Sequence, residues 1–263
     1  MNKTNKITLI IIILTILGYA ASFLIPSPVG WAAGQESFHW TLANSVLYTL
    51  LHIGAAVLLL VGVSSYKAEL RTAYIKIAAG IVLVGAGLAQ VVFLNIFGLI
   101  QSPWVQYGGV MLPFVVAGLA IYFGTRAMAR LVGVTSPLTK VRVVLPILLI
   151  LVAIAAFMPH GSTVLPELFF DVSNAISVWD VVLYAASLGL VLQIKSHSGT
   201  YYTESMAWLA LGLMGSVIIT LTVLAMTVMT GQPPEGLLID ILVAIGGLLY
   251  LKAGHSFVKT REL

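Results

Sequence analysis

The stretch RAMARLVGVTSPLTKVR, which runs from Arg126 to Arg142, divides the chain into two similar halves. It contains four basic side chains and no acidic one, and a block of long apolar runs lies on each side of it. A basic segment between apolar runs is typical of a loop on the cytoplasmic side of a membrane. The stretch therefore predicts where the two halves meet and on which side of the membrane they meet.

The composition of the whole chain points to the same environment. Of its 263 residues, 60% are hydrophobic and 8% are charged, whereas soluble domains average about 25% charged residues. We therefore expect an all-α polytopic membrane protein whose first partner is the lipid bilayer. The net charge of +4 does not indicate a nucleic-acid partner, because in a membrane protein the placement of charge matters more than its sum. The chain has no cysteine, which excludes disulfides, thiolate metal sites and cysteine nucleophiles.

The apolar runs predict eight membrane-spanning helices, each close to the length that crosses a bilayer. Their expected ranges are 7–25, 42–64, 75–100, 104–125, 143–158, 175–194, 205–230 and 236–257. The first range has a basic start like that of a signal peptide, but its apolar run is longer than the core of such a peptide. The fifth range is the weakest, because it is short and contains Pro146. Without it the chain would have seven spans and the C-terminus would lie outside.

The distribution of charge favours eight spans. With eight, all 13 lysines and arginines fall on one face of the membrane, from Lys3 in the first segment to Arg261 in the last. The opposite face holds none of them and carries six acidic residues: Glu36, Glu167, Asp171, Asp180, Glu235 and Asp240. Basic loops stay in the cytoplasm. We therefore expect an integral protein of a prokaryotic plasma membrane, with both termini cytoplasmic.

Two longer loops are expected on the outer face, at residues 26–41 and 159–174. Each begins at a proline directly after an apolar run. In the second, apolar and acidic side chains alternate. Such a segment is expected to rest on the membrane surface, with Leu165, Phe169 and Phe170 at the membrane boundary and Glu167 and Asp171 in water.

The two halves align with each other at an offset of 132 residues, which sets Gly80 on Gly212. The last span of each half aligns at a slightly smaller offset, with Gly118 on Gly246 and Tyr122 on Tyr250. Both halves start and finish in the cytoplasm, so they would be parallel repeats related by an axis along the membrane normal. We expect one four-helix repeat at 1–131 and a second at 132–263.

Polar side chains inside a membrane are costly, and for that reason they are the first candidates for function. The offset of 132 sets Tyr48 against Asp180 and His52 against Tyr184, and each half contributes its pair at the i, i+4 spacing of one helix face. These four residues are the candidate ligand-binding or proton-relay site. The alternative is that His52 is a packing residue and Tyr48 an interfacial anchor. The secondary polar candidates are Gln90, Asn95 and Asp240.

The sequence offers no pattern for a metal, a cofactor or a catalytic reaction. The histidines and carboxylates of the outer face lack the close spacing of a metal site. The sequence contains no HExxH motif and no glycine loop that could hold a phosphate. We therefore expect no metal and no cofactor, and an enzyme ranks third, behind the two classes of function that follow.

Two classes of function remain. The first is a non-enzymatic membrane component, that is, a sensor, an accessory subunit or a scaffold that binds a membrane-protein partner, a second copy of itself or a lipid. The second is a small transporter or channel for an ion or small solute, with its path along the axis between the halves. A water-accessible cavity that reaches His52 would favour transport, and a dry, packed axis would favour the first class.

Overall fold

A computed structural model describes residues 3–26, 38–64, 68–96, 112–134, 167–197, 203–230 and 237–261. All the described secondary structure is helical, which confirms the all-α expectation for this part of the chain. The described helices are α1 (Lys3–Ser22), α2 (Phe38–Val63), α3 (Ala68–Ile96), α5 (Leu112–Leu131), α7 (Glu167–His197), α8 (Thr203–Thr230) and α9 (Leu237–Arg261). Each of these seven is long and apolar enough to cross a membrane. The predicted fifth span, 143–158, lies outside the described residues.

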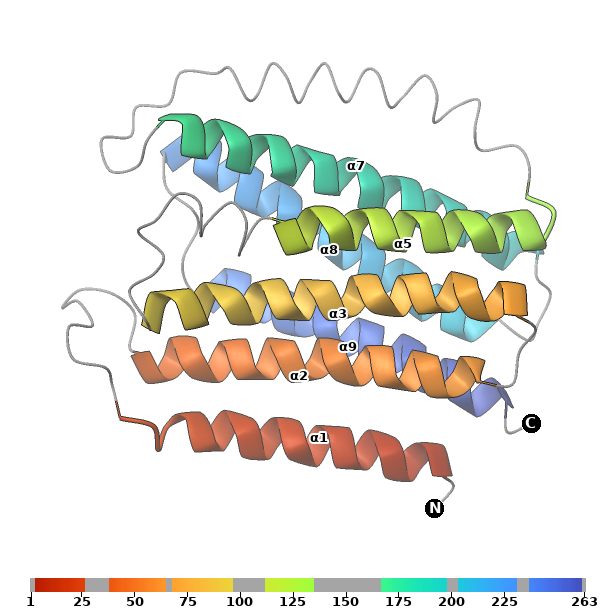
Figure 1. Cartoon of the computed structure of the whole chain (residues 1–263), viewed down its shortest axis with the longest axis horizontal. Coiled ribbons are helices and arrows are strands. Elements are labelled where there is room, and N and C mark those ends of the chain that lie inside the picture. The colour runs from red at the N-terminus through yellow and green to blue at the C-terminus, as the bar shows by residue number, and fades with distance from the viewer. Residues whose placement is uncertain are drawn as a thin grey trace.

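Six of the described helices form a closed ring. Around it, each helix packs on the next in the order α2, α3, α5, α7, α8, α9 and back to α2. α1 lies outside the ring, against α2 and α9 (Figure 1). The buried apolar core joins residues of all six ring helices, with Tyr74, Tyr250 and Phe257 as its largest fully buried side chains.

Several helices of the ring approach one another closely because glycine lies at their contacts. A Cβ atom on Gly80 would come within 2.8 Å of the Ala117 carbonyl oxygen, and one on Gly124 within 2.7 Å of the Ala73 carbonyl oxygen. Both glycines lie between α3 and α5, so any side chain there would separate these two helices. Small residues allow this kind of close packing in membranes, where no hydrophobic force drives helices together.

α1 presents most of its apolar side chains outward. Leu14 and Leu17 are 55% and 60% exposed, and in water such a helix would expose a large apolar patch. α1 is attached through Ile7 and Ile11, which pack against the core, and through small and polar residues. Gly18 lies against Val46 and Leu50 of α2, and Thr8 is hydrogen-bonded to His255 of α9 at 2.7 Å. The exposed face of α1 is therefore suited to lipid.

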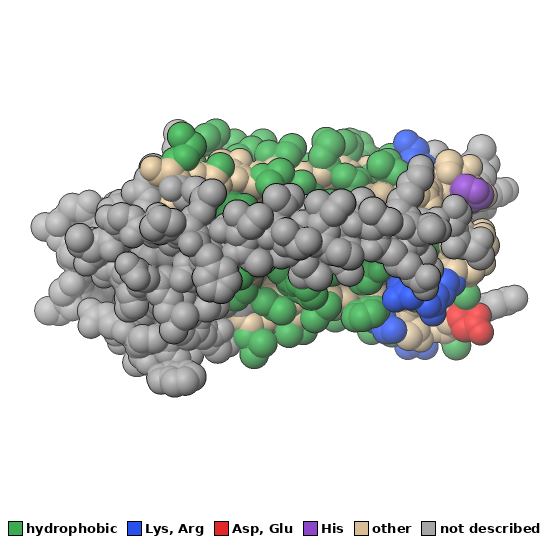
Figure 2. All heavy atoms as spheres, turned by 90° about the horizontal axis from the view of Figure 1, so that it is seen from above, with side chains coloured by type: hydrophobic (Ala, Val, Ile, Leu, Met, Phe, Trp, Pro, Cys, Tyr) green, Lys and Arg blue, Asp and Glu red, His purple; other side chains and the backbone are tan. Residues whose placement is uncertain are grey.

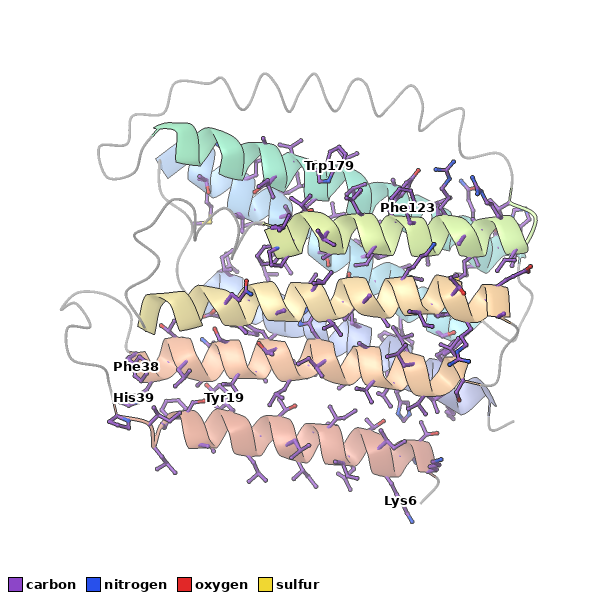
Figure 3. The ribbon with its side chains drawn as sticks, viewed as in Figure 1. Lys6, Tyr19, Phe38, His39, Phe123 and Trp179 are labelled. Carbon is purple, nitrogen blue, oxygen red and sulfur yellow. The ribbon has the colours of Figure 1, made fainter. Side chains whose placement is uncertain are left out.

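The basic residues gather at one end of the bundle. Figure 1 shows both chain termini at this end, where α1, α3 and α8 begin and α2, α5, α7 and α9 end. On the face shown in Figure 2, the lysine and arginine side chains lie at the same end. Lys6 points away from the bundle there, whereas Phe38 and His39 mark the start of α2 at the opposite end (Figure 3). We call these the basic end and the opposite end.

α5 and α7 run in the same direction. α5 finishes at the basic end, and α7 starts at the opposite end (Figure 1).

The end of α5 is a left-handed glycine cap: Gly133 has φ of +75°, and the Val134 N–H donates to the Ala129 carbonyl at 2.9 Å. This arrangement satisfies carbonyls that the helix end would otherwise leave without a donor.

The helix boundaries correct part of the sequence analysis. α7 begins at Glu167 and α2 at Phe38, although we expected starts at 175 and 42. The loop expected at 159–174 is therefore helical from 167 onward, and residues 159–166 and the side chains of 167–173 lie outside the described part. A hydropathy pattern detects only the hydrocarbon-deep section of a helix. At 31 residues, α7 is about 46 Å long and exceeds the roughly 30 Å core of a bilayer.

Candidate functional site

A line of hydrogen-bonding side chains follows one face of α2. Trp40, Asn44, Tyr48 and His52 are spaced four residues apart, so they lie on neighbouring turns of the same face. We call this set the α2 polar stripe. Asn44, Tyr48 and His52 are all buried, and the stripe extends from the opposite end of the bundle to the middle of the helix.

Asp240, in the first turn of α9, receives three donors from this stripe. The Tyr48 hydroxyl donates to its Oδ1 at 2.6 Å. The Asn44 amide and the Trp40 indole N–H donate to its Oδ2 at 2.8 and 3.3 Å. A helix N-terminus also favours a negative charge. The Asp240 carboxylate is therefore well compensated and joins α2 to α9.

Sequence reasoning placed Asp240 among the secondary candidates and did not select Trp40 or Asn44. The signal that could have found them was the four-residue spacing, which continues the Tyr48–His52 pair toward the start of α2. We treated residues before 42 as loop, and this hid the first member of the stripe. Tyr48 is thus hydrogen-bonded to Asp240, a partner that the alignment of the halves did not suggest.

His52 is enclosed by neighbouring helices. Its side chain is 3% exposed. A Cβ atom on Gly85 of α3 would lie 2.9 Å from the His52 Cβ, and one on Gly247 of α9 would lie 3.4 Å from its Cε1. The His52 Nδ1 lies 2.7 Å from the Tyr48 carbonyl oxygen. Because a carbonyl only accepts, this nitrogen carries a proton and donates it.

Tyr250 of α9 lies at the same level and links His52 to other ring helices. The two rings have centroids 6.0 Å apart. The Tyr250 hydroxyl is hydrogen-bonded to Ser216 of α8 at 2.8 Å. Tyr184 of α7 is buried and close enough to Tyr250 to interact with it electrostatically. Tyr250 entered the sequence analysis only as a match for Tyr122 between the halves, and nothing in its neighbourhood in the sequence marks it as a link between three helices.

Asp180 occupies a second, different environment. It is 5% exposed and is the seventh residue of the membrane-spanning part of α7, Asn174–His197, so it lies in the outer half of that span. Its Oδ1 would be 3.0 Å from a Cβ atom on Gly118 of α5. This oxygen is buried and has no hydrogen bond within the described part of the chain. Tyr184, one turn further along α7, is close enough to interact with it electrostatically.

The four primary candidates thus fall into two connected groups. Tyr48 belongs to the Asp240 group near the opposite end. His52 and Tyr184 lie at mid-bundle near Tyr250, and Asp180 lies one turn from Tyr184 along α7, toward the opposite end. Of the remaining secondary candidates, Gln90 is exposed on α3, and the side chain of Asn95 lies outside the described part.

Two aromatic residues complete the geometry. His39 stacks on Phe23 with a centroid separation of 6.4 Å at the opposite end, next to Tyr19 and Phe38 (Figure 3). Trp179, labelled on α7 in Figure 3, lies three turns inside its helix, and its buried indole N–H has no hydrogen bond within the described residues.

The fold and composition define an integral membrane protein built as a helical bundle. The chain matches no protein-family model, no curated protein and no solved structure. Its function therefore has to be inferred from the geometry of its own residues.

Proposed function

We propose that this chain is a non-enzymatic integral membrane component, that is, a sensor, an accessory subunit or a scaffold that binds a membrane partner or a lipid. The observation that carries this proposal is the packing around His52. Gly85 and Gly247 bring α3 and α9 against the histidine, and its Nδ1 is engaged by a carbonyl of its own helix. A residue that lines a solute path needs access to water, and His52 has almost none.

The Asp240 group supports the same proposal. Its carboxylate is held by three donors from α2, so it connects two helices and has few lone pairs left for a solute. Buried polar groups of this kind fix how helices fit together. We therefore infer that Tyr48, His52 and Asp240, which the sequence offered as functional candidates, mainly hold the helices in one arrangement.

A two-part measurement tests the proposal. The full chain, reconstituted in liposomes, is expected to add no ion or proton flux above protein-free vesicles. Photo-crosslinking groups on the exposed face of α1, for example at Leu14 and Leu17, are expected to capture one discrete membrane partner or lipid in native membranes. Saturable flux through the purified chain would contradict a purely structural or sensory role.

A small transporter or channel is the second candidate, and Asp180 is the observation in its favour. An acidic side chain inside a spanning helix is a functional candidate by default. Flux that is saturable and lost in Asp180→Asn would favour this candidate over the first.

We also propose that the chain is a duplicated bundle of eight spans, with repeats at 1–131 and 132–263. Two pairs of glycine contacts support it. Gly80 lies against Ile121 in the first half and Gly212 against Tyr250 in the second, while Gly118 lies against Leu183 and Gly247 against Leu51.

In these contacts Gly80 and Gly212 are 132 residues apart, as are Leu51 and Leu183, which is the offset expected from the sequence. For the last helix of each half the offset is instead 129 residues, which pairs Gly118 with Gly247 and Ile121 with Tyr250. The sequence alignment had paired Gly118 with Gly246, so the contacts favour an offset that is one residue larger.

The direction of α5 and α7 supports the fifth span. Because α5 ends at the basic end and α7 begins at the opposite one, the chain has to pass from one end to the other between them. Both termini would then lie in the cytoplasm of a prokaryotic cell, on the side where the basic residues gather.

A further inference from the structure

Asp180 is a buried acidic residue for which the described packing provides no hydrogen-bond donor at Oδ1. The residue is 5% exposed. Oδ1 is buried and has no hydrogen bond within the described residues. Asp240, by contrast, has three donors on its two carboxylate oxygens.

The groups that face Asp180 offer no counter-charge. α5 contributes Gly118, and its cations Arg126 and Arg130 follow eight and twelve residues later, about 12 and 18 Å along the helix. α7 contributes Tyr184, while its own basic residues, Lys195 and His197, lie in its last turn.

The other helices add further polar groups. α8 contributes Ser216, which is bonded to Tyr250 of α9, and its carboxylate, Glu204, lies in its first turn. His52 of α2 lies at the level of Tyr250, and the buried Trp179 indole N–H lies next to Asp180 in α7. Among the described groups named here, none is a cation placed beside Asp180.

Physical chemistry then restricts the state of this carboxyl. An ionised aspartate inside a membrane helix is costly, and a buried charge without a partner costs more. Taking up a proton removes the charge. The protonated acid is also a donor, so the neighbouring hydroxyl oxygens become possible acceptors for it.

We propose that Asp180 is a reversible proton-binding site. It is neutral while α5 and α7 are packed together at Gly118, and it releases its proton to water when that contact opens. The proton passes from an Asp180 carboxyl oxygen to a water molecule, and the ionised carboxylate is then hydrated and can accept from the Tyr184 hydroxyl. Proton binding and the closed α5–α7 contact stabilise each other, because only the closed arrangement excludes water. This site is independent of whether the protein binds a partner or transports a solute.

Infrared difference spectroscopy of the full chain in lipid nanodiscs tests the site directly. At neutral pH we expect the carbonyl stretch of a protonated carboxylic acid, which disappears as the pH is raised and returns when it is lowered. The band should be lost in Asp180→Asn and kept in Asp240→Asn, because the proposal assigns the proton to Asp180. Gly118→Ala, which pushes on Oδ1, should shift the pH at which the band disappears.

The wild-type chain provides a second measurement in case a variant does not fold. The sequence contains three aspartates, Asp171, Asp180 and Asp240. Labelling aspartate with carbon-13 should shift the band, whereas labelling glutamate should leave it in place. The proposal is overturned if no protonated aspartate is seen at neutral pH, if the band survives Asp180→Asn, or if it fails to respond to alkaline pH.

Discussion

The Tyr48 hydroxyl in α2 lies 2.6 Å from Oδ1 of Asp240 in α9, and 192 residues separate the two in the chain. This bond connects the first half of the ring to the last helix. It also separates Tyr48 from the mid-bundle group around Tyr250, with which the sequence had associated it.

Asp240→Ala is expected to lower the free energy of unfolding by about 2–3 kcal/mol, because it leaves three donors without their shared acceptor. Tyr48→Phe removes one of the three bonds and should cost about 1 kcal/mol, the scale of hydrogen bonds between membrane helices. Reversible unfolding in detergent or lipid measures both. Tyr19→Phe is the control, because it removes a hydroxyl from α1 and keeps the ring that packs on Phe23. Equal effects of the two tyrosine variants would argue against the Asp240 group as a stabilising contact.

Gly124→Ala should destabilise the bundle by about 1–3 kcal/mol. The new methyl group would lie 2.7 Å from the Ala73 carbonyl oxygen, a backbone atom that cannot turn away. Gly189→Ala is the matched control, because a Cβ there meets nothing within 4 Å and alanine is the better helix former by up to about 1 kcal/mol. The same unfolding measurement should rank the control variant at or above the wild type. A Gly124→Ala protein as stable as the Gly189→Ala protein would show that α3 and α5 do not meet at this glycine.

Gly80→Ala and Gly212→Ala, at positions that the proposed repeat aligns, should have unequal effects. At Gly80 the added Cβ meets the Ala117 carbonyl at 2.8 Å, whereas at Gly212 the nearest atoms belong to the Tyr250 ring at 2.9 Å. A ring can move more easily than a backbone, so Gly80→Ala should be the more destabilising variant. Gly212→Ala should instead disturb the bond between Ser216 and Tyr250. Unfolding curves compare the stabilities, and ultraviolet resonance Raman spectra of tyrosine report the Tyr250 hydroxyl. A larger loss of stability for Gly212→Ala would contradict this ranking.

Single-cysteine labelling should place the basic end in the cytoplasm. The chain has no native cysteine, so each introduced thiol reports one position. In intact cells, a membrane-impermeant maleimide should label Leu24→Cys, where the leucine is 85% exposed after α1. It should label Arg130→Cys and Lys259→Cys only after the cells are opened. Labelling of position 130 from outside would reverse the proposed orientation.

The same reagent tests the fifth span. Ser136→Cys should be protected in intact cells and Ser162→Cys should be accessible, because the chain leaves α5 at the basic end and enters α7 at the opposite end. A match between the two positions would mean that residues 143–158 do not cross the membrane. The second half of the chain would then have an odd number of spans, and the two proposed repeats could not be parallel.

Much of the fold could be predicted because membrane insertion depends on local composition. A run of about 20 apolar residues has to be helical in lipid, where every backbone group needs an internal partner. For that reason the seven described helices coincide with predicted spans. The errors fall at helix ends, as at Glu167 and Phe38, because polar residues can continue a helix beyond the hydrocarbon core and hydropathy does not register them.

The candidate site could be predicted only in part. The i, i+4 spacing identified Tyr48 and His52 as residues of one face, and the cost of a buried charge singled out Asp180. No local pattern could show that Tyr48 reaches Asp240, that Tyr250 lies near His52 and Tyr184, or that Gly118 closes over Asp180.

The sequence by itself determined that this protein is helical and lies in a membrane, and that its described basic residues share one end, because hydrophobicity and charge act residue by residue. Only the tertiary structure decided which polar groups meet. The order of helices around the ring places α9 beside α2 and α5 beside α7. Asp240 thus receives three hydrogen bonds. Asp180 is buried against Gly118, and its Oδ1 has no hydrogen bond in the described part of the chain.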